Sequence, residues 1–149
     1  GVDWYLQEAD RQLAGRKPLP GPVSNIASWN YPMSVQVHAE LVQILAGNAV
    51  VAKTPSQGGF HCLTLAHALM RREGLPVTLV SGMGSSLGDI LIRGEGIGAL
   101  AFVGGRANGR KAATTLADTG PQTTNTNSTN RTPCSFLVPK GSSCECEEQ

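Results

Sequence analysis

Groups that could bind a phosphorylated ligand follow several short apolar segments of this 149-residue chain. Lys53 comes directly after one apolar run, where its ammonium group can reach a ribose hydroxyl or a phosphate. Gly104 and Gly105 follow another run, and glycines let a phosphate come close to backbone N–H groups. Ser28-Trp29-Asn30 ends a third run. Because an open parallel sheet binds ligands beyond the carboxyl ends of its strands, these positions are the first candidates for a ligand site.

The elements that must position these groups alternate between strands and helices along the chain. Short runs rich in Val and Leu, without polar–apolar alternation, indicate strands that are buried on both faces of a parallel sheet. Segments with helical spacing of apolar residues separate these runs. The predicted strands are 23–27, 49–52, 77–80 and 99–103, and the predicted helices are 33–45, 62–72, 87–92 and one that begins near Gly109. The expected fold class is therefore α/β, with a parallel sheet and flanking helices.

Composition divides the chain into three parts. Residues 1–20 are expected to form an N-terminal helix and a proline-rich turn, and residues 21–118 the α/β domain. Residues 119–149 are low in complexity and rich in Thr and Asn, so they are predicted to be a disordered tail that cannot fold alone. The one apolar cluster of this tail, Phe136-Leu137-Val138, could at most add to a sheet edge.

Four motifs, in this order and spacing, resemble the aldehyde dehydrogenase superfamily. They are Ile26-Ala27-Ser28-Trp29-Asn30-Tyr31-Pro32, Ala46-Gly47-Asn48-Ala49-Val50-Val51-Ala52-Lys53, Gly74-Leu75-Pro76, and Phe102-Val103-Gly104-Gly105 with Gly109-Arg110. The resemblance covers residues 21 to about 113. It implies a Rossmann-like NAD(P)-binding domain that is incomplete relative to the full family fold.

The resemblance assigns roles to individual residues. It implies that Asn30 stabilises the oxyanion that forms on the aldehyde, whereas from the sequence alone Asn30 could equally cap the following helix. It assigns Lys53 to the adenosine ribose. Ser56 stands where the family usually has a glutamate, which would repel a 2′-phosphate, while a hydroxyl can donate a hydrogen bond to it. NADP is therefore at least as plausible a cofactor as NAD.

Glycines near two helix starts are candidates for contact with the cofactor phosphates. The segment from Gly104 to Gly109 lies where a strand ends and a helix begins, while the spacing of Gly82-Met83-Gly84 and Gly88 departs from the dinucleotide fingerprint. Arg106, where the family usually has Thr, could contact phosphate or face solvent. The predicted cofactor-binding residues are Ser28, Trp29, Lys53, Ser56, Gly84, Gly104, Gly105 and Gly109.

Family catalysis also needs a cysteine thiolate that attacks the aldehyde and a glutamate that activates water. None of the four cysteines lies in a recognisable nucleophile context. We therefore predict a cofactor-binding fragment of an NAD(P)-dependent oxidoreductase that oxidises aldehydes through a cysteine thiohemiacetal, inactive on its own. Two alternatives are a non-catalytic nucleotide-binding module and a scaffold whose glycines serve only turns and packing.

Bulk properties narrow the set of partners. The formal net charge of +1 offers no basic patch for nucleic acid, and no apolar run approaches the roughly 18 to 20 residues that span a membrane. The cysteine pattern favours a cytoplasmic location. His61 and His67, six positions apart, lie on different helix faces, so no metal site is expected. The expected partners are the nucleotide cofactor and, in the parent enzyme, an aldehyde substrate. The parent enzyme could also form a homo-oligomer.

Overall fold

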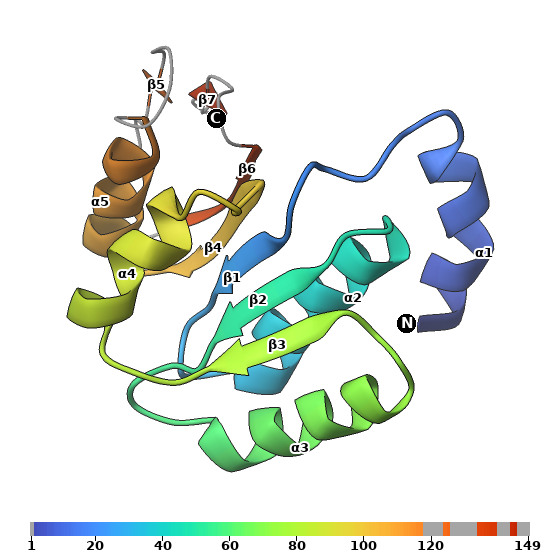
Figure 1. Cartoon of the computed structure of the whole chain (residues 1–149), viewed down its shortest axis with the longest axis horizontal. Coiled ribbons are helices and arrows are strands. Elements are labelled where there is room, and N and C mark those ends of the chain that lie inside the picture. Colours follow the sequence, from blue (N-terminus) through green and yellow to red (C-terminus); the bar gives the residue numbers. More distant parts are fainter. Residues whose placement is uncertain (1, 118–123, 126–133, 140–143, 146–149) are drawn as a thin grey trace.

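A five-stranded sheet forms the centre of the computed structural model, which describes residues 2–117, 124–125, 134–139 and 144–145 (Figure 1). Within these residues the strand order is β3-β2-β1-β4-β6. The strands β1 (Val23–Ile26), β2 (Val50–Lys53), β3 (Val77–Val80) and β4 (Ala99–Gly104) run parallel, and β6 (Cys134–Pro139) is antiparallel to β4. The predicted α/β fold with a parallel sheet is confirmed.

Helices cover both faces of this sheet and leave the ends of the strands open. On one face, α4 (Gly84–Arg93) and α5 (Arg106–Ala117) pack against β4, where Ile92 and Leu116 join a core with Leu100 and Phe102. On the other, α2 (His38–Leu45) and α3 (Phe60–Arg72) pack against β2 and β3. The N-terminal helix α1 (Val2–Leu13) lies beside α2. No helix in the described part of the chain combines the length and apolar character needed to cross a membrane.

All four predicted helices differ from the observed ones in their boundaries, with α3 beginning two residues and α4 three residues earlier than predicted. The segment predicted as one helix over 33–45 begins as a π-helix, η1 (Pro32–Val37), and continues as α2. The last helix begins at Arg106 rather than near Gly109, and the Gly109 N–H donates to the Gly105 carbonyl oxygen at 3.0 Å. The prediction near Gly109 was wrong because a glycine lowers helix propensity without preventing helix formation.

The predicted disordered tail falls largely on residues that lie outside the described ranges. Within the ranges, Phe136-Leu137-Val138 belongs to β6 and pairs with β4 at Phe102, Ala101 and Leu100. Two short strands, β5 (Thr124–Asn125) and β7 (Cys144–Glu145), pair in parallel. The apolar cluster of the tail therefore does add to a sheet edge. The domain boundaries at residues 20 and 118 stay predictions.

The segments that lead into β1 and β4 cross each other at contact distance. A Cβ atom added to Gly98 would lie 2.0 Å from the carbonyl oxygen of Pro20, and one added to Gly21 would lie 2.2 Å from that of Gly96. The Gly98 N–H donates to the Pro22 carbonyl oxygen at 2.9 Å. This crossing brings Val23 and Ala99 into register at the start of the two strands.

We therefore expect Gly98→Ala to destabilise the fold by about 1–3 kcal/mol or more, because a backbone carbonyl occupies the space that the methyl group needs. Urea unfolding of the 149-residue chain measures this. Gly96→Ala in the same loop is the matched control, since a Cβ there meets nothing within 4 Å. Equal stability of the two variants would contradict the close approach.

Candidate functional site

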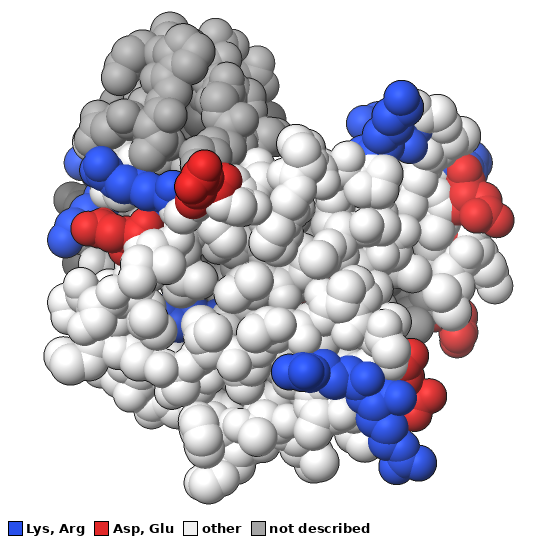
Figure 2. All heavy atoms as spheres, viewed as in Figure 1, with Lys and Arg blue, Asp and Glu red and all other residues white. Residues whose placement is uncertain are grey.

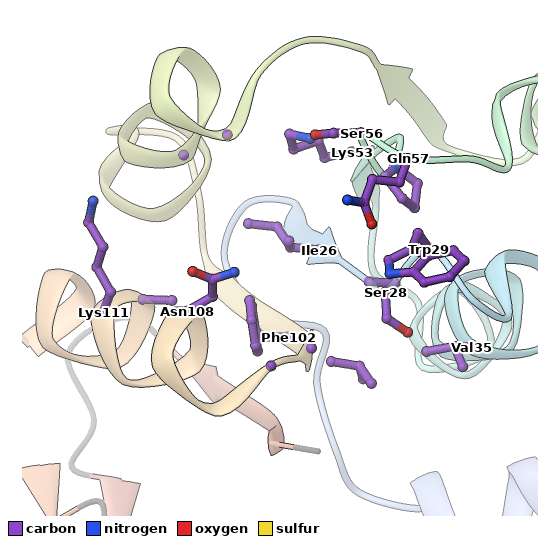
Figure 3. Close-up of a pocket in the computed structure, with 18 of the residues that line it drawn as sticks. Ile26, Ser28, Trp29, Val35, Lys53, Ser56, Gln57, Phe102, Asn108 and Lys111 are labelled. Atoms are coloured by element: carbon purple, nitrogen blue, oxygen red, sulfur yellow. The ribbon is translucent and has the colours of Figure 1, made fainter. Parts of the chain in front are cut away.

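A cleft of about 1300 Å³ opens beyond the carboxyl ends of β1, β2 and β4 (Figure 3). The chain proceeds from β1 outward to β2 and β3, then returns to place β4 on the other side of β1. The connections that leave β1 and β4 therefore diverge, which is the arrangement called a topological switch point. In open α/β sheets, ligands bind in the crevice at this point.

The loop after β1 forms one wall of the cleft, with Ser28, Trp29 and Asn30 all lining it. The next residue, Tyr31, occupies the cap position of η1, where no side chain makes a capping hydrogen bond. Its carbonyl oxygen accepts the first bond of η1, from the Val35 N–H at 2.9 Å. Asn30 is therefore not used as a helix cap and stays exposed beside the cleft. Short π-helical segments of this kind often mark functional sites.

The end of β2, the strand next to β1, supplies a buried cation to the cleft. Lys53 is only 7% exposed, and its Nζ donates to the Thr54 carbonyl oxygen at 3.0 Å. Burial lowers the pKa of its ammonium group below the ordinary value of 10.5. An ammonium group has three N–H donors, so this contact leaves donors for a ligand. Ser56 lies beside Lys53 in Figure 3, and both Ser56 and Gln57 are exposed at the cleft.

The glycines at the two helix starts are not equivalent. Gly84, Gly104 and Gly105 line the cleft, and a Cβ on Gly84 or Gly105 would meet nothing within 4 Å. At Gly104 a Cβ would lie 2.9 Å from the ring of Phe102, so packing already favours glycine there. Gly109 is buried inside α5 and does not line the cleft, and its N–H bonds within the helix. The structure thus brings together every predicted site residue except Gly109.

One face of α5 adds polar groups that the sequence prediction did not include. Asn108, Lys111 and Thr115 all line the cleft, and their spacing places them on one helix face. This spacing was the signal that could have identified them. Arg106, for which the sequence left two roles open, also lines the cleft. Its Nε is buried and has no hydrogen-bond partner among the described residues.

Charge in the cleft is predominantly positive. Lys53, Arg106 and Lys111 line it, with Asp89 as the one acidic residue among the lining residues. On the face shown in Figure 2, by contrast, charges of both signs lie mostly toward the periphery, including a group of basic side chains over the C-terminal end of α3. The cleft therefore concentrates the groups that favour an anionic ligand.

These features define an α/β protein with an anion-attracting cleft at the switch point of its sheet. Comparison with known proteins gives a more specific class. A family model described as the aldehyde dehydrogenase family matches residues 4–130. Because this match covers most of the chain, the chain belongs to the aldehyde dehydrogenase family.

Individual relatives are similar to only part of the chain. The NADP-dependent glyceraldehyde-3-phosphate dehydrogenase of Apium graveolens is 36% identical over 96 residues, which are 62% of this chain and 19% of that protein. The crystal structure of NADP-dependent glyceraldehyde-3-phosphate dehydrogenase from Bacillus halodurans C-125, complexed with NADP, matches with a TM-score of 0.60 and 29% identity. That match covers 67% of this chain and 21% of the Bacillus chain.

The crystal structure of HpcC from Thermus thermophilus matches with a TM-score of 0.67 over 78% of this chain and 25% of that chain. At 22% identity, this likeness supports the fold alone. The chain therefore spans a quarter or less of these relatives.

The buried ammonium group of Lys53 has a consequence for stability. Because the folded-state pKa lies below 10.5, the folded protein holds this proton more weakly than the unfolded chain does. Burial of the charged ammonium group therefore lowers the free energy of unfolding. This loss of stability is fully present at neutral pH and disappears as the pH rises to 10.5 and above. We expect Lys53→Met to raise the free energy of unfolding at neutral pH, by an amount that shrinks toward pH 10.5.

Urea unfolding at several pH values measures this difference, with Lys17→Met, at an exposed lysine, as the matched control. A loss of stability in Lys53→Met at neutral pH would mean that the contact with Thr54 outweighs the cost of burial.

Proposed function

We propose that this chain is the cofactor-binding part of a dehydrogenase that uses NADP to oxidise aldehydes. The observation that carries the proposal is the pairing of buried Lys53 with an uncharged Ser56 at the switch-point cleft. An acidic residue at Ser56 would repel a 2′-phosphate, whereas a hydroxyl can donate to it. Membership of the aldehyde dehydrogenase family, and relatives whose names specify NADP, support the same assignment.

The residues of the cleft fit such a cofactor. Lys53 has donors left for the ribose hydroxyls, and Ser56 lies beside it for the 2′-phosphate. The first N–H groups of a helix have no acceptor inside it, and Gly84 at the start of α4 has open space around it. At the start of α5, Gly105 is open in the same way, and Arg106, which lines the cleft, contributes a positive charge that favours an anion.

We propose that the side-chain N–H of Asn30 donates a hydrogen bond to the aldehyde oxygen as negative charge develops there. It lines the cleft, is exposed, and is not used as a helix cap. Bound NADP supplies the acceptor for the hydride that leaves the aldehyde carbon. We infer that the thiolate nucleophile and the general base belong to other parts of the parent enzyme, so that this chain alone does not turn over an aldehyde.

Titration with NADPH and NADH, followed by nucleotide fluorescence, tests the proposal directly. We expect saturable binding of NADPH that weakens at least about tenfold in Lys53→Ala, because the charge-assisted contact to the nucleotide is lost. Absence of saturable binding in a folded chain would instead favour the scaffold alternative, in which the glycines serve turns and packing.

Ser56→Glu tests the cofactor preference. The carboxylate should weaken NADPH binding at least about tenfold through repulsion of the 2′-phosphate, while NADH binding changes much less. Ser34→Glu introduces the same charge at an exposed serine that does not line the cleft, and serves as the control. Equal losses for both nucleotides in Ser56→Glu would contradict the assignment of Ser56 to the 2′-phosphate.

The remaining inferences concern the parent enzyme. A cytoplasmic location and a homo-oligomeric parent stay predictions. Incubation of the chain with NADP and an aldehyde should give no NADPH absorbance, and turnover would contradict the inferred absence of a nucleophile and general base.

A further inference from the structure

A chain of buried polar groups crosses the interior beneath the cleft wall. Asn25 of β1, Glu40 of α2 and His67 of α3 are 1%, 0% and 3% exposed. The Nε2 of His67 lies 3.2 Å from the Oε2 of Glu40, and its Nδ1 lies 2.8 Å from the Leu63 carbonyl oxygen. Asn25 Nδ2 approaches the other carboxylate oxygen of Glu40 at 3.4 Å and donates to the Gln36 carbonyl oxygen at 3.1 Å. These polar groups therefore link α3, α2, β1 and η1.

Glu40 and His67 form an ionisable pair in which both side chains are buried. Burial on its own lowers the pKa of His67, but the Glu40 carboxylate and the Leu63 carbonyl raise it, so the pKa lies above its ordinary value of 6.5. Among the described residues, Glu40 is the one ionisable group that shifts the pKa of His67. The further contacts of the pair, from Leu63 to His67 and from Asn25 to Glu40, carry no charge. A buried ion pair of this kind contributes little net stability compared with an apolar pair. Its presence therefore calls for another explanation.

The segment held by these polar groups is η1, which follows directly after the loop at the cleft. A π-helix is rare and bonds residue i to residue i+5 instead of i+4, so contacts from outside the segment are needed to favour its register. Asn25 provides one by holding the Gln36 carbonyl oxygen. On the opposite side, Gly59 approaches so closely that an added Cβ would lie 2.6 Å from the Cβ of Pro32. The position of η1 in turn determines where Tyr31 and the preceding Trp29-Asn30 segment lie.

We propose that Glu40 and His67, acting through Asn25, are positioning residues that fix η1 and thereby hold Trp29 and Asn30 at the cleft. Buried polar groups are best attested as devices that select one register among several. The part of this inference that concerns the role of Asn30 rests on the proposed function. Changes around Trp29, in contrast, can be measured without any nucleotide. Loss of the proton from His67 should loosen the contact with Glu40 and change the surroundings of Trp29.

The test uses Trp29 as a reporter in the 149-residue chain. The chain has two tryptophans, so Trp4→Phe leaves Trp29 alone, and Trp29 is 57% exposed and accessible to a quencher. Emission and acrylamide quenching are followed from about pH 5 to about pH 9, across the range in which histidine titrates. We expect a transition with a midpoint above 6.5, the ordinary pKa of histidine.

Substitutions assign this transition to one histidine. His67→Gln should abolish it while circular dichroism shows a folded chain. The controls are His61→Gln, at an exposed position of the same helix, and His38→Gln, which removes the ring beside η1 that contacts Tyr5. Both controls should retain the transition. Its absence from the Trp4→Phe chain, or its persistence in His67→Gln, would overturn the proposal.

If His67→Gln does not fold, replacing Glu40 and His67 together by Leu removes both charges without leaving one unpaired. This double variant should fold and show no transition, and a transition there would also overturn the proposal. NADPH titration of the same proteins separates the two hypotheses. A Trp29 transition without NADPH binding would refute the proposed function alone, and NADPH binding without a transition would refute the positioning role alone.

Discussion

The pairing of β1 with strands on both of its sides is the constraint on which the rest of the structure depends. Val23 is in register with Val50 of β2 on one side and with Ala99 of β4 on the other. Parallel strands in register end at the same level. The carboxyl ends of β1, β2 and β4 therefore bring together the loop after β1, Lys53 and Gly104. The close crossing at Gly21 and Gly98 fixes this register where the strands begin.

Two sites of buried ionisable side chains show that the region is not arranged for stability alone. Lys53 loses hydration on folding and gains a hydrogen bond to a neighbouring carbonyl oxygen. Glu40 and His67 lose hydration too, and they recover part of the cost by pairing with each other. Apolar residues at these positions would cost less. Groups that are costly to bury are typical of sites where position or charge matters more than stability.

Much of the fold and part of the site could be predicted because they depend on residues adjacent in sequence. Val-rich runs without alternation located β1 to β4. Lys53 was placed at the cleft because it stands at the end of such a run, and Ser56 because the family resemblance puts it three residues further on. The π-helical start of 32–37 could not be predicted, since its sequence has ordinary helical spacing. The contact between Glu40 and His67 joins two helices, and nothing local indicates it. Gly109 was expected at the start of a helix because the start of α5 was predicted three residues late, and in the structure it lies inside that helix.

The antiparallel strand β6 affects how firmly the cleft is held. With β6 beside β4 and β3 beside β2, each of the three strands that end at the cleft has a hydrogen-bonded neighbour on both sides. The edge position on the other side falls to β3, whose end does not line the cleft. Sites that are supported by doubly paired strands keep their geometry better than sites on edge strands or loops. The short segment Cys134–Pro139 therefore supports the cleft, because it makes β4 an interior strand.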